Sequence, residues 1–386
     1  MILAIISICL FASIPSISSS SSPPTPISTN NASCGGSGNP IDDCWRRCDP
    51  GWADDRQRLA DCGVGFGRDA VGGGKGGRLY VVNDSSDDAE RPGTLRHGLG
   101  QDEALWIVFA RDMTIRPAHE LVVRPRKTVD GRGARVVVGD GGACFAVRGA
   151  RDVVIHGITI RGCRPKPKAA AAADESMGSS SSHDDDVSDG DGVSVINSTD
   201  VWIDHCTFED CADGLIDVVE GSTRVTLSNN LLQNHDKAML LGHSDEYTDD
   251  AAMRVTVAFN RFGPGLVQRM PRCRFGLFHV INNDYIDWEM YAVGGSSAPT
   301  IVSHGNRFSA DKAKEVTKRD GDAPESVWCK WNWISEGDLM LNGAFFKTSG
   351  KAGPDLKAPS FARSASSVPS ITSSAGALSC KEGSPC

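Results

Sequence analysis

The chain has 386 residues, 40% of them hydrophobic, which is enough to bury the core of one large domain or of two ordinary ones. Its formal net charge of −9 at pH 7 argues against nucleic acid as a partner. The same charge would repel an acidic polymer, so an anionic substrate would need local cations or a bound metal.

Residues 1–20 have the pattern of a secretory signal peptide, in which the apolar stretch Ile2–Leu10 is followed by small residues. This stretch is too short to span a bilayer, and no later one is long and apolar enough. Twelve of the 13 cysteines lie beyond the signal, and an even number suits disulfides in an oxidising compartment. Asn31, Asn83 and Asn197 begin Asn-X-Ser/Thr triplets, which are glycosylation acceptors. We therefore expect a secreted glycoprotein without a membrane segment.

Residues 21–38 are rich in Ser and Pro and are predicted to form a linker. Residues 41–62 have helical character, but Pro50-Gly51 interrupts it, which favours two short turns over one rod. From residue 79 onward the chain turns to short β-branched runs without long helices between them, which argues against a doubly wound α/β fold. The first of these predicted strands are Leu79–Val82, Trp106–Phe109, Thr128–Asp130, Val136–Val138 and Cys144–Val147.

Six similar segments follow one another further along the chain. They begin at Val153, Val201, Val225, Val255, Phe278 and Ile301, at offsets of 48, 24, 30, 23 and 23 residues. The first offset is either two periods or one period that carries an insertion. Four of the segments align an Asn column two places before an apolar column, and stacked Asn amides can form a hydrogen-bonded ladder. Short strands that repeat near every 23 residues predict an all-β fold, a parallel β-helix.

We expect this β-helix domain to span residues 39–345, with a C-terminal tail at 346–386. Residues 164–187 interrupt the repeat with runs of Ala, Ser and Asp, and this low-complexity stretch is predicted to be a loop insertion.

Polar residues recur with the same period. Asp189, Asp213 and Lys237 are each 24 residues apart, and Arg269 follows after 32. Equal offsets from the repeat predict Asp213 and Lys237 on adjacent strands of one face, with Asp217 on that face as well. Carboxylates clustered on a rigid face repel one another unless a cation joins them, and ligands that are all oxygen suit Ca²⁺ better than zinc.

Several motifs recur in order at compatible spacing, and together they resemble the plant pectate lyases of polysaccharide lyase family 1. The resemblance covers most of the chain beyond the linker, from residue 39 to residue 338. Its motifs are Asp189-Gly-Asp-Gly, Val201-Trp-Ile-Asp-His-Cys, Cys211-Ala-Asp-Gly-Leu-Ile-Asp, Met239-Leu-Leu-Gly-His-Ser-Asp and Gln268-Arg-Met-Pro-Arg-Cys-Arg. The resemblance implies a right-handed parallel β-helix that cleaves de-esterified homogalacturonan by β-elimination with Ca²⁺, giving 4,5-unsaturated oligogalacturonates.

The resemblance also implies roles for single residues. Asp189, Asp213 and Asp217 match the calcium ligands of the family, and Asp191 is a further candidate. Arg269 matches the catalytic base, which takes the C5 proton of a galacturonate unit. Lys237 and Arg274 match positions that hold the substrate carboxylate. An arginine is charged at ordinary pH, so a base of this kind predicts an alkaline pH optimum.

Two other functions stay open from the residues alone. A β-helix polygalacturonase would use Asp pairs to activate water, and hydrolysis would give no unsaturated product. A wall protein that binds pectin without cleaving it is the second. Plant members resemble one another in carrying an aromatic, basic segment there, whereas residues 164–187 have Lys166 and Lys168 at their start and then Ala, Ser and Asp, with no aromatic residue. In every case the predicted partner is pectin or polygalacturonate, and we expect a monomer.

Two disulfides are hypothesised from the positions of the cysteines. Cys44–Cys62 would tie the N-terminal segment together, and Cys144–Cys163 would join neighbouring turns of the coil.

Overall fold

The structure is a computed structural model that describes residues 36–46, 48–74, 76–166, 187–320, 323–351, 353 and 356–386. The chain divides into one unit at residues 1–35 and a second at residues 36–386, and only the second is described. The predicted signal peptide, most of the predicted linker and residues 167–186 of the predicted loop lie outside the described residues. No described helix is both long and apolar enough to cross a membrane.

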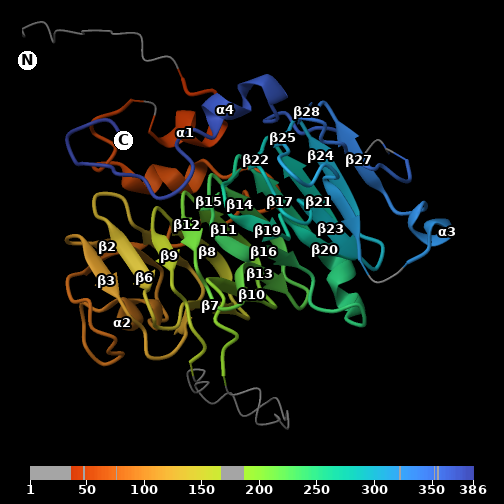
Figure 1. Cartoon of the computed structure of the whole chain (residues 1–386). Helices are drawn as coiled ribbons and strands as arrows, with labels where there is room; N and C mark the ends of the chain where they lie inside the picture. The colour runs from red at the N-terminus through yellow and green to blue at the C-terminus, as the bar shows by residue number, and fades with distance from the viewer. Residues whose placement is uncertain are drawn as a thin grey trace, which may run out of the picture. The chain divides into compact units, whose positions relative to one another are not determined.

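The second unit is a coil of short strands arranged in three parallel sheets, so the predicted parallel β-helix is confirmed (Figure 1). The first sheet has ten strands: β1 (Arg78–Val82), β2 (Leu105–Phe109), β5 (Lys127–Asp130), β8 (Arg151–His156), β11 (Thr199–Asp204), β14 (Thr223–Ser228), β17 (Arg254–Ala258), β21 (Leu277–Ile281), β24 (Thr300–His304) and β27 (Trp333–Glu336).

The second sheet carries the predicted site residues and is called the site sheet here. Its strands are β4 (Leu121–Val122), β7 (Phe145–Arg148), β10 (Val193–Ile196), β13 (Gly214–Val219), β16 (His235–Leu241), β20 (Arg272–Arg274), β23 (Val293–Ser296) and β26 (Thr317–Arg319), and β19 (Leu266–Gln268) also pairs with β16.

The third sheet closes each turn of the coil. Its strands are β3 (Met113–Ile115), β6 (Val136–Gly139), β9 (Thr159–Arg161), β12 (Thr207–Glu209), β15 (Leu231–Leu232), β18 (Arg261–Phe262), β22 (Asp284–Ile286), β25 (Arg307–Ser309) and β28 (Leu339–Leu341).

The helices are short and lie outside the coil. They are α1 (Pro40–Trp45), α2 (Leu95–Leu99), α3 (Glu325–Trp328) and α4 (Val368–Ile371), with 3₁₀ turns at η1 (Arg56–Asp61), η3 (Thr248–Ala252) and η5 (Ala365–Ser367). The two short turns predicted within residues 41–62 correspond to α1 and η1.

The six aligned segments pair in the predicted register. Val153 lies opposite Val201, and Val201 lies opposite Val225, although 48 residues separate the first pair. The 48-residue offset is therefore one turn of the coil that carries an insertion. The later segments continue in step through Val255, Phe278 and Ile301.

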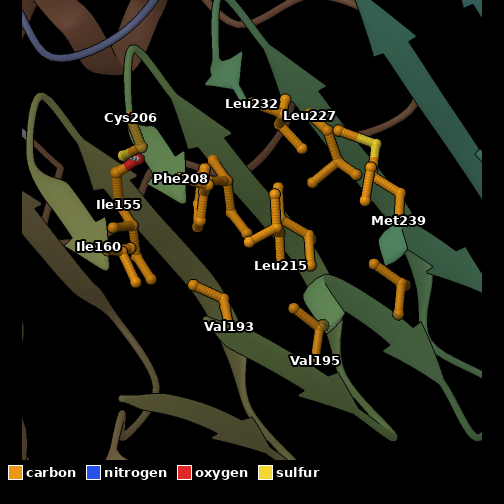
Figure 2. Close-up of a cluster of buried hydrophobic side chains, with 14 of the residues drawn as sticks. Ile155, Ile160, Val193, Val195, Cys206, Phe208, Leu215, Leu227, Leu232 and Met239 are labelled. Atoms are coloured by element: carbon orange, nitrogen blue, oxygen red, sulfur yellow. Dashed lines mark hydrogen bonds between the residues drawn. The ribbon is translucent and has the colours of Figure 1, made fainter. Parts of the chain in front are cut away.

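Apolar side chains from all three sheets fill the interior of the coil. Figure 2 shows Val193 of the site sheet, Phe208 and Leu232 of the third sheet and Leu227 of the first sheet converging on one space, and all four are fully buried. This alternation follows from the two-residue period of a strand, since every second side chain points inward.

The predicted Asn ladder is present in the interior. The side-chain amide of Asn230 donates to Asn260 Oδ1 at 3.0 Å, Asn260 donates to Asn283 at 2.9 Å, and Asn283 donates to Asn306 at 3.0 Å. Beside the ladder, the rings of Phe262, Tyr285 and Phe308 stack at centroid distances of 4.7 and 4.4 Å. Each turn therefore repeats the contacts of its neighbour, which holds the registers of the sheets together.

Both ends of the described chain pack on the outer face of the first sheet. Helices α1 and α4 lie side by side (Figure 1), and Ile41, Trp45, Val368 and Ile371 share one buried cluster. Asn39 joins the two helices, because its amide donates to the carbonyl of Ile371 at 3.1 Å.

Both hypothesised disulfides, Cys44–Cys62 and Cys144–Cys163, are present. A third joins Cys380 to Cys386 in the tail.

Candidate active site

The candidate site lies on the outward face of the site sheet. Val193, Ile216 and Met239 occupy matching positions of β10, β13 and β16 and point into the core. The next residue of each strand therefore points outward, and this row contains Ser194, Asp217 and Leu240. The row continues to Arg272 on β20. The register thus places a carboxylate and an arginine on one face, two strands apart.

The register differs by one residue from the spacing that the sequence predicts. Lys237 lies opposite Gly214, so Asp213 falls one position before β13, in the bend that leads into the strand. The corners of the coil absorb the extra residue. Asp213 and Lys237 nevertheless meet, because the lysine ammonium forms a salt bridge with the Asp213 carboxylate and both side chains are about one-third exposed, at 36% each.

Two carboxylates meet above Gly214. A side-chain carbon placed on this glycine would lie 2.3 Å from Asp217 Oδ1 and 3.2 Å from Asp191 Oδ1, so only a glycine leaves room for them. Asp191 accepts hydrogen bonds from the Gly214 amide at 2.7 Å and from the Ser194 hydroxyl at 2.9 Å. Asp217 Oδ1 is buried and has no hydrogen-bond partner.

The carboxylates of Asp191 and Asp217 are largely buried and repel one another when both are charged. Burial, with added repulsion from Asp213 and Asp189, raises the pKa of Asp191 to about 6. Burial likewise raises the pKa of Asp217 well above its usual range, the charges of Asp191 and Asp213 add to this effect, and Arg269 opposes it. All four aspartates thus act on one another, and Arg269 lies within range of the same carboxylate.

The donor set fits calcium in chemistry, although it is not assembled around one point. Among the described residues, no group of three or more acidic, His or Cys side chains is arranged to hold a metal ion. One reason is visible at Asp213, whose carboxylate is paired with Lys237. A bound cation would give the unpartnered oxygen of Asp217 a ligand. It would also lower the pKa of Asp191, which is raised by burial and by the neighbouring carboxylates. The residues that could hold Ca²⁺ are Asp189, Asp191, Asp213 and Asp217.

Arg269 lies at an interruption of the sheet. Lys237 pairs with Gln268 and Leu240 with Arg272, so the strand beside β16 carries one more residue than β16 does between these pairs. Arg269 takes up this residue with a left-handed backbone, φ 63°, and its carbonyl accepts from the Met239 amide at 2.6 Å. A non-glycine residue in this conformation costs about 1–3 kcal/mol, so the fold holds Arg269 against a local preference. Its Nε is buried without a hydrogen-bond partner.

Arg274 lies near the site, but its guanidinium already makes hydrogen bonds within the protein. Its Nη1 donates to the carbonyls of Gly242 and His243 at 2.8 and 3.0 Å, and its Nε donates to Asp245 at 3.1 Å. Burial, together with the charge of Arg272, lowers its pKa. The structure therefore brings together Asp189, Asp213, Asp217, Lys237 and Arg269, while Arg274 borders them with much of its guanidinium already bonded.

Sequence reasoning assigned no role to Ser194 or Arg272. Ser194 supports Asp191, and Arg272 extends the basic side of the face. A signal for Arg272 was present in the chain, because Arg272 and Arg274 alternate around Cys273, which is buried, so both must point outward.

This geometry defines a parallel β-helix protein with aspartates and arginines gathered on one outer face, and comparisons with known proteins agree with it. The pectate lyase family model matches residues 177–376. Probable pectate lyase 5 of Arabidopsis thaliana is 56% identical over 363 residues, covering 92% of this chain and 87% of that protein. The pectate lyase of Zinnia elegans is 54% identical over 367 residues, covering 92% and 88%.

Solved structures give the same result. The crystal structure of Jun a 1, the major allergen from cedar pollen, superposes with a TM-score of 0.82 at 46% identity, over 88% of this chain and 99% of that one. A thermostable pectate lyase shares the fold at 19% identity, with a TM-score of 0.60 over 81% and 96% of the two chains. The chain belongs to the pectate lyase family and is an enzyme of that class.

Proposed function

We propose that the protein is a calcium-dependent pectate lyase, which cleaves de-esterified homogalacturonan by β-elimination and releases 4,5-unsaturated oligogalacturonates. The observation that carries the proposal is the meeting of Asp191 and Asp217 above Gly214, with one oxygen unpartnered and Arg269 within electrostatic range. The signal peptide predicted for residues 1–20 supports secretion, so the proposal includes an activity outside the cell, in the wall.

In this proposal Asp189, Asp213 and Asp217 hold the calcium ion, with Asp191 beside them. When bound, the ion withdraws charge from a galacturonate carboxylate and makes the neighbouring C5 proton more acidic. The Asp213 carboxylate cannot bind the ion and keep its full salt bridge with Lys237 at the same time. Lys237 is therefore freed to hold a substrate carboxylate when Asp213 takes up its other role.

Arg269 takes the C5 proton in its neutral form. The side chain is suited to this role because its backbone is held in a fixed, left-handed conformation and its charge acts on Asp217. Lys237 and Arg274 then stabilise the negative charge that develops on the substrate carboxylate. Electrons from the broken C5–H bond form the 4,5 double bond as the C4–O bond breaks, and the leaving oxygen takes up a proton from solvent water.

The function is tested by following absorbance of the unsaturated product from polygalacturonate, with calcium and with chelator. We expect product only with calcium, and a rate that rises from neutral to alkaline pH, as general-base catalysis by an arginine requires. A flat profile over that range would remove Arg269 from the role of base.

The Arg269→Ala variant separates the lyase from the two alternatives. We expect it to retain binding to polygalacturonate and to lose at least 100-fold in turnover, the usual size of a general-base contribution. Reducing ends without ultraviolet absorbance would indicate a hydrolase. Binding without any turnover by the wild-type protein would indicate a pectin-binding wall protein.

A further inference from the structure

Asp245 connects three neighbouring strands of the site sheet at their ends. It lies in the bend that follows β16, and its Oδ1 accepts hydrogen bonds from the hydroxyls of Ser296 and Ser297 at 2.5 and 2.8 Å. The same oxygen accepts from Arg274 Nε at 3.1 Å. Arg274 is the last residue of β20 and lies opposite Ser296, the last residue of β23. One carboxylate oxygen therefore ties the bend after β16 to the ends of the two strands that follow in the sheet.

The bend that carries Asp245 is itself held in place. Asp250 is fully buried, and its carboxylate accepts from the His243 amide at 2.6 Å. Gly242 has φ 115°, and a side-chain carbon there would lie 2.7 Å from the Cβ of Arg274. The bend can therefore approach Arg274 this closely only because a glycine occupies the position.

These contacts leave one end of the Arg274 guanidinium available. Nε donates to Asp245, and Nη1 donates to the carbonyls of Gly242 and His243. Nη2 makes no hydrogen bond with the described residues and remains accessible to solvent, and the whole side chain is 12% exposed. A guanidinium has five N–H donors in a fixed plane, so the two that are left, both on Nη2, point in a direction that the other bonds determine.

Asp245 also compensates the positive charges around Arg274. Burial lowers the pKa of Arg274, the charges of Arg272 and Arg269 lower it further, and Asp245 opposes them. Burial alone would raise the pKa of Asp245, but the serine hydroxyls and the charge of Arg274 lower it. The carboxylate therefore stays charged and keeps its bond to the guanidinium.

We propose that Asp245 is a positioning residue, which orients the Arg274 guanidinium so that Nη2 meets the carboxylate of the galacturonate unit that loses its C5 proton. Without Asp245 the guanidinium keeps only its Nη1 bonds and can tilt about that end, so Nη2 no longer has one direction. The serine hydroxyls act one step further out, because they fix the carboxylate oxygen that fixes the arginine. This inference rests on the proposed function, since Arg274 meets a substrate carboxylate only if the substrate is the proposed polymer.

The first test is a double-mutant cycle of Asp245→Ala and Arg274→Ala, measured as unsaturated product from polygalacturonate with calcium. We expect Asp245→Ala to lower kcat about tenfold and to raise KM only about threefold, because Arg274 acts mainly on charge that develops during the reaction. Arg274→Ala should lower kcat about 100-fold. In that background Asp245→Ala should cause no further loss, because its effect is exerted through Arg274. Losses that multiply to about 1,000-fold would overturn the positioning role.

A conservative variant and a matched control separate this role from a structural one. Asp245→Asn keeps an oxygen that can accept from Arg274 Nε, so we expect kcat within about threefold of wild type. A kcat as low as that of Asp245→Ala would show that only the charge matters, which overturns the positioning role. Asp112→Ala is the control, because Asp112 accepts from Arg135 Nε at 2.8 Å on the third-sheet side and is 53% exposed. It should leave kcat and KM unchanged, and a loss equal to that of Asp245→Ala would overturn the inference.

Melting curves show whether each variant is folded. If Asp245→Ala does not fold, Ser297→Ala takes its place in the cycle, because it removes one of the two hydroxyls that hold the carboxylate. We expect kcat to fall about threefold in Ser297→Ala and not at all when Arg274→Ala is already present. Equal losses in the two backgrounds would overturn the inference.

Titration with saturated oligogalacturonates keeps this inference separate from the lyase proposal. If the wild type binds them but gives no unsaturated product, the lyase proposal fails and the cycle is measured in the dissociation constant. About threefold weaker binding by Asp245→Ala, which disappears in the Arg274→Ala background, then still supports the positioning role. Equal binding by wild type and Asp245→Ala, or no binding by the wild type, overturns it.

Discussion

At the scale of single residues, the site is defined by charges that the folded chain leaves poorly compensated. Asp217 has a buried oxygen without a partner, and Asp191 lies beside it above a glycine that cannot be larger. A cation that joined them would convert this repulsion into attraction. We therefore expect a bound cation, or the loss of one of these charges, to stabilise this face of the coil.

We expect Asp217→Asn to melt at a higher temperature than wild type in chelator, because the amide removes one of the repelling charges. The gain should be about 1–2 kcal/mol, given that the side chain is buried among like charges. If calcium binds as proposed, it should raise the melting temperature of the wild type, and the same variant should lose that rise. Scanning calorimetry with chelator and with calcium measures both effects. Asp55→Asn is a suitable control, because its side chain is exposed and makes no capping hydrogen bond, although Asp55 is the N-cap residue of η1. A lower melting temperature in chelator would contradict the account.

At the scale of elements, the repeat explains why the strands were predictable. The columns that align in the sequence are the columns that pair in the sheets, since a two-residue period and a turn near 23 residues leave few other registers. The bends between the strands of one turn have no such fixed period. The one-residue slip that puts Lys237 opposite Gly214, and the extra residue at Arg269, arise at corners and interruptions where spacing carries no register information.

Contacts between elements that are far apart in the chain could not be predicted from the sequence either. His205 binds Asp42 across 163 residues, and no local pattern links the two. In the same way, the ion pair of Arg272 with Asp320 depends on which strands become neighbours, and only the folded coil determines that.

The Asn ladder is the element whose loss should be most costly. Asn260 Oδ1 accepts from the backbone N–H of Asn230 at 2.9 Å, and the side-chain amide of Asn260 donates to the Leu227 carbonyl at 2.8 Å, all within the core. Asn260→Ala leaves these groups unsatisfied, so we expect a loss of about 2–4 kcal/mol in the free energy of unfolding. Thr223→Ala is the control, because it removes one exposed bond to Ala252 and should cost under about 1 kcal/mol. Urea unfolding measures both, and similar losses would refute a special role for the ladder.

At the scale of the whole described unit, one buried ion pair holds both ends of the chain on the coil. His205 Nε2 lies 2.8 Å from Asp42 of α1, while its Nδ1 lies 3.2 Å from the carbonyl of Gly376 in the tail. Burial alone would raise the pKa of Asp42, but the charges of His205 and Arg46 lower it to about 2. Burial alone would lower the pKa of His205, but Asp42 and Asp204 raise it.

These shifts give the pair a pH window. The part due to Asp42 is present above its ordinary pKa of 3.8 and is lost as the pH falls toward 2. The part due to His205 is present below its ordinary pKa of 6.5 and is lost as the pH rises through the higher, folded value. The pair therefore contributes fully between about pH 4 and 6.5.

We expect Asp42→Asn to cost about 3 kcal/mol within that window, because it leaves a buried histidine without its counter-ion. The difference from wild type should narrow at alkaline pH, where His205 is neutral in both proteins. Urea unfolding at pH 6 and at pH 9 tests this, with Asp55→Asn again as the exposed control. A gap that stayed constant with pH would show that the pair acts through packing and not through charge.

The pairing of β8 with β11 has a practical consequence for engineering. These strands match residue for residue on either side of a long excursion, and the turns before and after it keep their step. The register of the strands that carry the site residues therefore does not depend on the sequence inserted between β9 and β10. We therefore expect a protein in which residues 167–186 are exchanged for an unrelated sequence to keep the pairing of β8 with β11 and of β10 with β13, and with it the positions of the reactive groups.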